Sequence, residues 1–237
     1  MSRSKLRPRP EQIAELTGGL TLPLPPVPQL VMLVIAETLA RAWNDLLARH
    51  AETLRTGDEA EVSTLLITRL NALRDEEPRW ENLASGVNRG EESINFDGRH
   101  LEKRPDLSIH LTRRYFSFPL VAECKLIDKA GKKTVKLYCA DGLTRFVRGD
   151  YAWATREAFM LAYVRDSSDI KDCLVPYLTG SRHKSPDPCH TERLPTRPNQ
   201  AQANLACSLH SRHFAYIHQQ AASPGPIDLW HLWLPVT

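Results

Sequence analysis

The chain has 237 residues, of which 42% are hydrophobic and 25% charged, which is enough apolar material for one large domain or two small ones. No segment approaches the ~20 consecutive apolar residues that cross a membrane, and the basic start SRSKLRPRP lacks the apolar core of a signal peptide. Five cysteines without close pairing are typical of reduced thiols. We therefore expect a soluble, cytoplasmic protein with no membrane partner.

The positive charge is concentrated in one part of the sequence. The net charge of the chain is only +3, but residues 99–148 contain 12 Lys and Arg against 5 Asp and Glu. The rest of the chain is therefore net acidic. A local excess of positive charge favours an approaching polyanion such as nucleic acid.

The first part of the chain predicts a basic arm followed by two helices. Residues 1–28 are basic and rich in proline, which favours an extended arm. Apolar residues then recur at helical spacing from Gln29 to Leu54 and again from Asp58 to Leu73. We therefore expect an arm and helix, residues 1–57, packed on a core of residues 58–237.

The stretch from Arg104 to Ile127 predicts two neighbouring strands that carry charged residues on one face. Asp106 opens the first apolar-alternating run, and Glu123 and Lys125 lie in the second. Side chains alternate with a period of two, so Glu123 and Lys125 point to the same side of the sheet. If the strands pair, two carboxylates and an ammonium meet, which can form a site for a hard divalent cation.

The remaining sequence predicts further helices and strands around this pair. Proline-rich residues 181–204 are expected to form a long loop. The other expected elements, in chain order, are a helix over residues 135–146, a helix capped by Asp150 and continuing through Ala158 and Leu161, a strand near residues 160–164 parallel to the Glu123 strand, a helix from Asp169 to Gly180, and two closing strands in residues 205–217 and 227–236.

Pro105-Asp106, followed 17 positions after Asp106 by Glu123-Cys124-Lys125, resembles the motif of the PD-(D/E)xK nuclease superfamily. The stretch from Tyr138 to Val164 is similar to segments that follow the E-x-K strand in small bacterial nucleases, many of them in phage-defence systems. The resemblance implies an α/β, restriction-endonuclease-like fold with a mixed central sheet flanked by helices. It also implies an endonuclease that hydrolyses DNA, acting in anti-phage defence.

The resemblance further implies a set of site residues. Asp106 and Glu123 would hold Mg²⁺, with Mn²⁺ as a substitute, and the backbone carbonyl of Cys124 would add a ligand. Lys125 would orient the attacking water. Members of the superfamily often carry a glutamate on the helix before the catalytic strands, for which we match Glu61 first and Glu59 second; acidic residues in a first helical turn are also favoured by the helix dipole alone. The expected phosphate contacts are Arg104, Lys136, Arg145 and Arg148.

Partners and alternatives follow from the same reasoning. A chain of this size without a specificity module is expected to work as a homo-oligomer, with an ATPase, helicase or other defence subunit, or with both. One alternative is a catalytically silent, nuclease-like binding subunit of such a complex, and another is a nuclease that acts on RNA. A purely structural salt bridge of Lys125 is a third interpretation. Cys207 and His210 form only a weak half-signature for zinc, and no structural zinc is expected.

Overall fold

A computed structural model describes residues 10–90, 96, 104–199, 202–216 and 222–236. In chain order, its helices are α1 (Pro10–Leu16), α2 (Gln29–Thr56), α3 (Glu59–Glu76), α4 (Pro78–Leu83), α5 (Val135–Leu137), the π-helix η1 (Tyr138–Leu143), α6 (Thr144–Val147), the π-helix η2 (Ile170–Leu174) and α7 (Val175–Arg182). Its strands are β1 (Ala84–Arg89), β2 (Leu107–Leu111), β3 (Leu120–Ile127), β4 (Glu157–Val164), β5 (Thr191–Thr196), β6 (Leu205–His210) and β7 (Ile227–Pro235).

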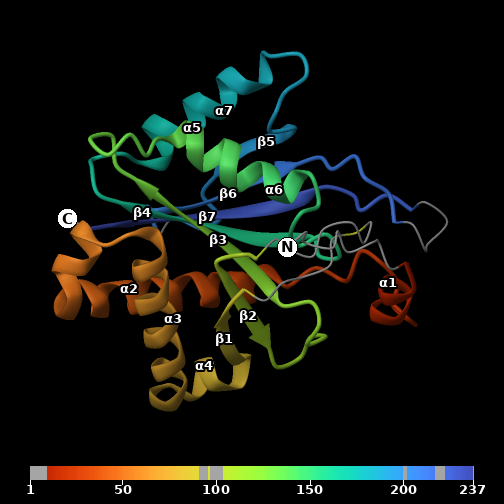
Figure 1. Ribbon diagram of the computed structural model, residues 1–237, viewed down its shortest axis with the longest axis horizontal. Helices are drawn as coiled ribbons and strands as arrows, with labels where there is room; N and C mark the ends of the chain where they lie inside the picture. Colours follow the sequence, from red (N-terminus) through yellow and green to blue (C-terminus); the bar gives the residue numbers. More distant parts are fainter. Residues whose placement is uncertain (1–9, 91–95, 97–103, 200–201, 217–221, 237) are drawn as a thin grey trace, which may run out of the picture.

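The strands form one mixed seven-stranded sheet in the order β1-β2-β3-β4-β7-β6-β5. The central strand β4 pairs in parallel with β3 and with β7, and the other neighbours are antiparallel. The chain is therefore an α/β protein with helices on both faces of its sheet, as the sequence predicts at this level (Figure 1).

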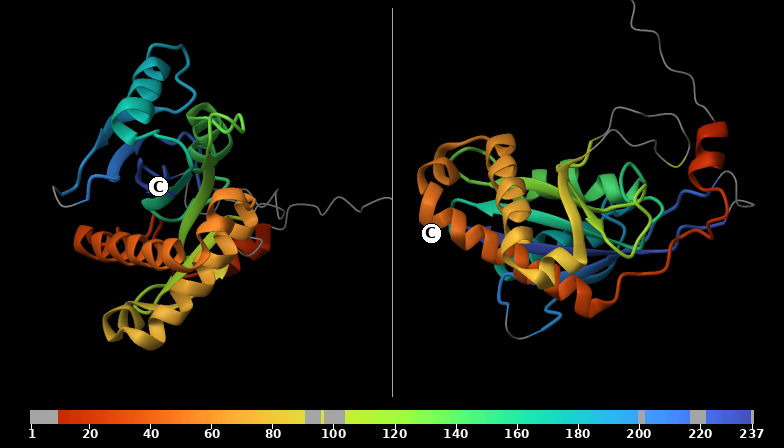
Figure 2. Two further views of the ribbon diagram at one scale, coloured as in Figure 1. Left: turned by 90° about the vertical axis from the view of Figure 1, so that its left-hand side faces the viewer. Right: turned by 90° about the horizontal axis from the view of Figure 1, so that it is seen from below.

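The helices before and after strands β2 and β3 cover opposite faces of the sheet (Figures 1 and 2). Helices α2, α3 and α4 pack on one face in a large apolar core, where Trp43 stacks on Tyr163 at 5.2 Å between ring centroids. Helices α5 to α7 cover the central strands on the other face, where the core includes Tyr138, Phe146 and Trp233. No helix in the described ranges is long and apolar enough to span a membrane.

Side chains of α3 fasten the outer strand of the sheet. The amide of Asn71 donates to the carbonyl of Val87 at 2.6 Å and accepts from the Val87 N–H at 3.0 Å. Arg74 Nε donates to the carbonyl of Ala84 at 2.8 Å. Strand β1 therefore has hydrogen-bond partners on the side away from β2 as well.

Several predicted elements differ from the observed ones. The helix expected after Asp150 is wrong, because residues 157–164 form β4. The strand expected near residues 160–164, parallel to β3, is confirmed and begins earlier, at Glu157. Every residue of β4 is buried, so its sequence lacks the alternation that identifies a strand exposed on one face. The helix expected over residues 135–146 is divided into α5, η1 and α6.

The long loop expected over residues 181–204 is also wrong in part, because it contains the edge strand β5. This strand includes Pro195 and pairs irregularly with β6, so it carries little of the usual strand pattern. The first closing strand ends at His210 rather than continuing toward residue 217. Residues 1–9 of the expected basic arm lie outside the described residues. Its second part is not simply extended, because Pro10–Leu16 form α1 and the side chains of Leu22, Leu24 and Val27 are buried.

Candidate active site

Strands β2 and β3 bring Asp106 and Glu123 together at the end of their antiparallel pairing. Leu107 is paired with Ala122, so Asp106 lies just before β2 and beside Glu123. The Asp106 Oδ2 atom accepts a hydrogen bond of 2.7 Å from the backbone N–H of Cys124. The two carboxylates therefore come from adjacent strands, as the sequence predicts.

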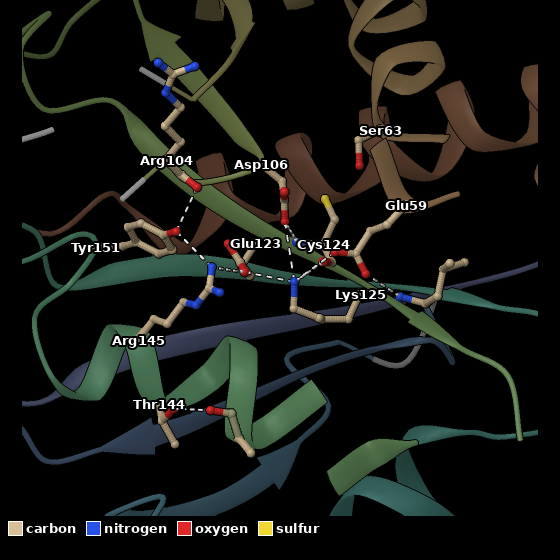
Figure 3. A network of polar contacts seen from close by, with 12 residues as sticks. Glu59, Ser63, Arg104, Asp106, Glu123, Cys124, Lys125, Thr144, Arg145 and Tyr151 are labelled. Carbon is tan, nitrogen blue, oxygen red and sulfur yellow. Dashed lines mark hydrogen bonds and ion pairs between the residues drawn. The ribbon is translucent and has the colours of Figure 1, made fainter. Parts of the chain in front are cut away.

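The amine of Lys125 lies among three carboxylates (Figure 3). Its Nζ atom is 2.9 Å from Glu123 Oε1, 3.0 Å from Glu59 Oε1 and 3.8 Å from Asp106 Oδ2. It also donates to the carbonyl of Cys124 at 2.8 Å. We call Glu59, Asp106, Glu123 and Lys125 the acid–lysine cluster.

The acidic residue that α3 contributes is Glu59, not Glu61. Glu61 belongs to a capping box, in which its N–H donates to Asp58 Oδ1 and its carboxylate accepts from the Asp58 N–H, both at 2.8 Å. Glu59 instead accepts from Lys125 and from the N–H of Leu126 at 3.1 Å. Residues two positions apart on a helix point in different directions, so only one of the two glutamates reaches β3. The first-choice match to Glu61 is therefore corrected to the second choice, Glu59.

An arginine and a tyrosine extend the polar contacts of the cluster. Arg145, on α6, donates to Glu123 Oε1 and to the hydroxyl of Tyr151, both at 2.9 Å. The Tyr151 hydroxyl in turn donates to the backbone carbonyl of Arg104 at 2.7 Å. The sequence predicts Tyr151 only as a buried residue of a helix. No local sequence pattern indicates that its hydroxyl contacts the backbone of Arg104, which lies 47 positions earlier.

Three of the four predicted phosphate contacts line one hollow of about 450 Å³. Arg104, Arg145 and Arg148 line it together with Tyr151 and two acids, Asp141 and Asp150. Lys136 is exposed on α5 and does not line this hollow. The structure therefore gathers the arginines and leaves the lysine apart.

Burial perturbs the acids of the cluster. The side chain of Glu123 is 1% exposed, and its burial, together with the negative charge of Asp106, raises the pKa of Glu123 to about 7. Burial likewise raises the pKa of Asp106, against the attraction of Lys125. Burial alone would lower the pKa of Lys125, but the neighbouring carboxylates outweigh it and raise that pKa. Perturbation of this kind is typical of functional sites.

Glu123 also has an unsatisfied atom. Its Oε2 is buried and has no hydrogen-bond partner among the described residues, whereas Oε1 contacts both Lys125 and Arg145. A structural ion pair is expected to satisfy both oxygens, because an unpaired buried acceptor is costly. The unpaired oxygen therefore favours a site that awaits a further group.

The local backbone keeps η1 close to this cluster. A Cβ atom at Gly142 would lie 2.7 Å from Met160 Cε, 3.5 Å from Lys125 Cγ and 3.6 Å from Glu123 Cγ. Only glycine leaves room at the first of these distances without displacing Met160. The π-helical turn thus packs directly on the residues of β3 that carry the charges.

The donor atoms suit a hard cation. Carboxylates of Glu59, Asp106 and Glu123 and the carbonyl of Cys124 are all oxygen ligands, the type that Mg²⁺ prefers. In the described part of the chain no three His, Cys, Asp or Glu side chains are arranged to hold a metal ion. The Lys125 ammonium contacts one oxygen each of Glu59 and Glu123. No family model, curated protein or solved structure matches the chain.

Proposed function

We propose that the chain is a metal-dependent nuclease of the PD-(D/E)xK, restriction-endonuclease-like type that hydrolyses phosphodiester bonds in DNA. The observation that carries the proposal is the convergence of Glu59, Asp106 and Glu123 on the amine of Lys125, with one oxygen of Glu123 buried and unpaired among the described residues. The order of elements supports it, since α3 precedes an antiparallel β1-β2-β3 unit and helices then lead to β4, parallel to β3.

In this proposal Asp106, Glu123, Glu59 and the carbonyl of Cys124 would hold Mg²⁺, with Mn²⁺ as a substitute. A bound divalent ion supplies Lewis acidity for a phosphoryl oxygen and lowers the pKa of a coordinated water. The carboxylate oxygens contact the Lys125 ammonium, so an ion competes with this ammonium for them.

Lys125 itself orients the attacking water and offers positive charge to the phosphorane as negative charge develops. Arg145 holds Glu123 Oε1 and faces the arginine-lined hollow, so it can contact the scissile or a neighbouring phosphate. The three arginines of the hollow place the phosphate backbone beside the acids.

DNA as the substrate, anti-phage defence, a homo-oligomer and an ATPase or helicase partner enter the proposal from the resemblance of the motif alone. RNA remains the alternative substrate. The substrate assay below separates these nucleic acids.

The second candidate is a nuclease-like binding subunit without catalysis. It is favoured by the two short ion pairs of Lys125, at 2.9 and 3.0 Å, which neutralise the cluster internally. The two candidates differ in one measurable property, because only the nuclease needs the cluster to bind a divalent ion.

The test is a cleavage assay on plasmid DNA, single-stranded DNA and RNA with Mg²⁺, Mn²⁺ or EDTA, combined with calorimetric titration of Mg²⁺. We expect metal-dependent cleavage that falls by roughly 100-fold or more in Glu123→Gln and Lys125→Met. Glu61→Gln and Lys136→Met are the matched controls, since neither residue reaches the cluster.

Two outcomes would reject the proposal. A wild-type protein that neither cleaves these substrates nor binds Mg²⁺ is the silent binding subunit. Cleavage that survives in both cluster variants places the chemistry elsewhere in the chain.

A further inference from the structure

A second cavity, of about 420 Å³, lies on the same face of the sheet as the acid–lysine cluster. Its walls come from β2 and β3, from the loop between them and from residues 152–155. This volume lies within the range of roughly 300–1,000 Å³ that is common for small-molecule sites. Its wall includes His110, Phe116, Phe118, Val121 and Trp153.

The cavity adjoins the proposed chemistry. Pro105 lines it, and the next residue, Asp106, belongs to the cluster. Val121 lines it and points to the same face of β3 as Glu123, about 7 Å further along the strand. Arg104, on the other side of Pro105, lines the arginine hollow. The cavity and the hollow therefore both adjoin the cluster.

His110 is the titratable side chain in the wall of this cavity. Its side chain is 95% buried, since the residue is 5% exposed, and neither ring nitrogen has a partner among the described residues. Buried polar atoms nearly always find a hydrogen-bond partner. A neutral imidazole offers one donor and one acceptor. A ligand that pairs with both ring nitrogens therefore needs a hydrogen-bond acceptor and a hydrogen-bond donor.

Three aromatic rings form another part of the wall. Phe116 stacks on His110 with ring centroids 4.3 Å apart and planes 25° apart, yet Phe116 is 69% exposed. Phe118 and Trp153 meet edge to face at 5.5 Å. Exposed aromatic rings next to a basic surface are the usual platform for unstacked bases of single-stranded nucleic acid.

We propose that this cavity is a nucleobase subsite, which binds an unstacked base of the nucleic acid strand whose phosphates lie along the cluster and the arginine hollow. The base stacks on Phe116, and the exposed Phe116 ring must turn off the imidazole that it covers for the edge of the base to hydrogen-bond to His110. This inference rests on the proposed function for the choice of ligand. It adds that the strand must be single or locally opened for its base to enter.

The test measures binding without cleavage. A fluorescent single strand containing all four bases is compared, by anisotropy in EDTA, with an abasic deoxyribose-phosphate strand of equal length and charge. We expect the intact strand to bind roughly 5- to 150-fold more tightly, which corresponds to the ~1–3 kcal/mol of one stacked base.

Two variants and a control locate the effect. Phe116→Ala and His110→Phe should lose most of the difference between the intact and abasic strands. Tyr115→Ala should keep it, because Tyr115 is equally an exposed aromatic of this loop but lines a different groove. His110→Phe should keep or raise the thermal midpoint, since it removes two unpaired nitrogens, and this separates lost binding from lost folding.

The results also separate this inference from the proposed nuclease activity. Base-dependent binding that Phe116→Ala removes supports the subsite even if no substrate is cleaved. Equal binding of the intact and abasic strands, or no binding of either, overturns the subsite even if Mg²⁺-dependent cleavage is found. A difference that Tyr115→Ala removes and Phe116→Ala retains overturns it as well.

Discussion

Two polar groups on one face of the sheet differ in how completely they are satisfied. In the acid–lysine cluster Glu123 Oε2 has no partner among the described residues. In the second group, which we call the histidine chain, Tyr138, His231, Ser208 and His210 are hydrogen-bonded in sequence at 2.7 to 2.8 Å. The two groups are close, because Glu123 and His231 are both register partners of Met160.

The backbone carbonyl of Cys189, at one end of the histidine chain, determines which group donates in each of its hydrogen bonds. The carbonyl of Cys189 can only accept, so His210 Nδ1 donates to it at 2.7 Å and His210 Nε2 accepts from Ser208. Ser208 then accepts from His231 Nε2, and Tyr138 donates to His231 Nδ1. Burial lowers the pKa of His210 to about 4 and that of His231 to about 3, which keeps both rings neutral.

Two kinds of buried polar group therefore lie on this face of the sheet. Every bond of the histidine chain is made inside the protein, so it is a structural element of the core. The cluster combines burial with raised carboxyl pKa values and an unpaired oxygen of Glu123, a combination that is typical of a ligand-binding site.

The largest effect is expected when Lys125 is replaced. Lys125→Met leaves the carboxylates of Glu59 and Glu123 without their shared counter-ion and should lower the free energy of unfolding by about 3 kcal/mol or more in EDTA. Mg²⁺ should then raise the thermal midpoint of the variant more than that of the wild type, because no ammonium competes for the oxygens. Lys136→Met is the control, and equal responses to Mg²⁺ would contradict this view of the cluster.

A slightly smaller change in the free energy of unfolding is expected when the pH is raised. Between pH 4.5 and about 7 the folded protein holds a proton on Glu123 that the unfolded chain has released, since the pKa of this carboxyl is raised on folding. Stability without metal should therefore fall as pH rises through this window, by up to about 3 kcal/mol. Urea unfolding at several pH values in EDTA measures it. Glu123→Gln should flatten this dependence, and an unchanged slope would show that another group causes it.

Breaking the histidine chain should lower the stability of the protein without changing its response to Mg²⁺. Ser208→Ala removes the link between His210 and His231 and leaves both Nε2 atoms unpaired, at a cost of about 2 kcal/mol. The shift caused by Mg²⁺ should equal that of the wild type. Ser211→Ala, which loses only a bond of 3.4 Å, should cost much less. A changed Mg²⁺ response in Ser208→Ala would mean that the two polar groups are coupled.

The smallest effect is expected from replacing either of the two glutamates in the first turn of α3. Glu61→Ala should lose about 1 kcal/mol of stability through the capping box and keep the Mg²⁺ affinity of the wild type. Glu59→Ala should weaken Mg²⁺ binding in calorimetry, because it removes a carboxylate of the cluster. The reverse pattern would restore Glu61 as the site residue.

Sequence patterns predict the core of the candidate site because it lies on strands with one charged face. The alternation of apolar and charged residues in β2 and β3 is enough to indicate the faces of Asp106, Glu123 and Lys125. Helix periodicity indicates α3 but not which of its first glutamates turns toward β3. That choice depends on the capping box with Asp58, a local bond that selects Glu61.

The rest of the site depends on contacts between distant segments. Tyr151 reaches Arg104 across 47 positions, and Arg145 reaches Glu123 across 22. Strand β4 is buried on both faces, so its sequence has no period of two, and its parallel place beside β3 is predicted only from the order of the elements. Such long-range pairing is set by the tertiary structure and has no local signal.

The fastening of β1 by α3 limits how copies of this chain can associate. A free outer strand is a template on which a strand of another molecule can extend the sheet. Here Asn71 and Arg74 take up backbone groups of Val87 and Ala84, and the opposite outer strand, β5, contains a proline and an irregular register. Neither border of the sheet is thus built for β-augmentation, and a dimer would have to join through side-chain surfaces.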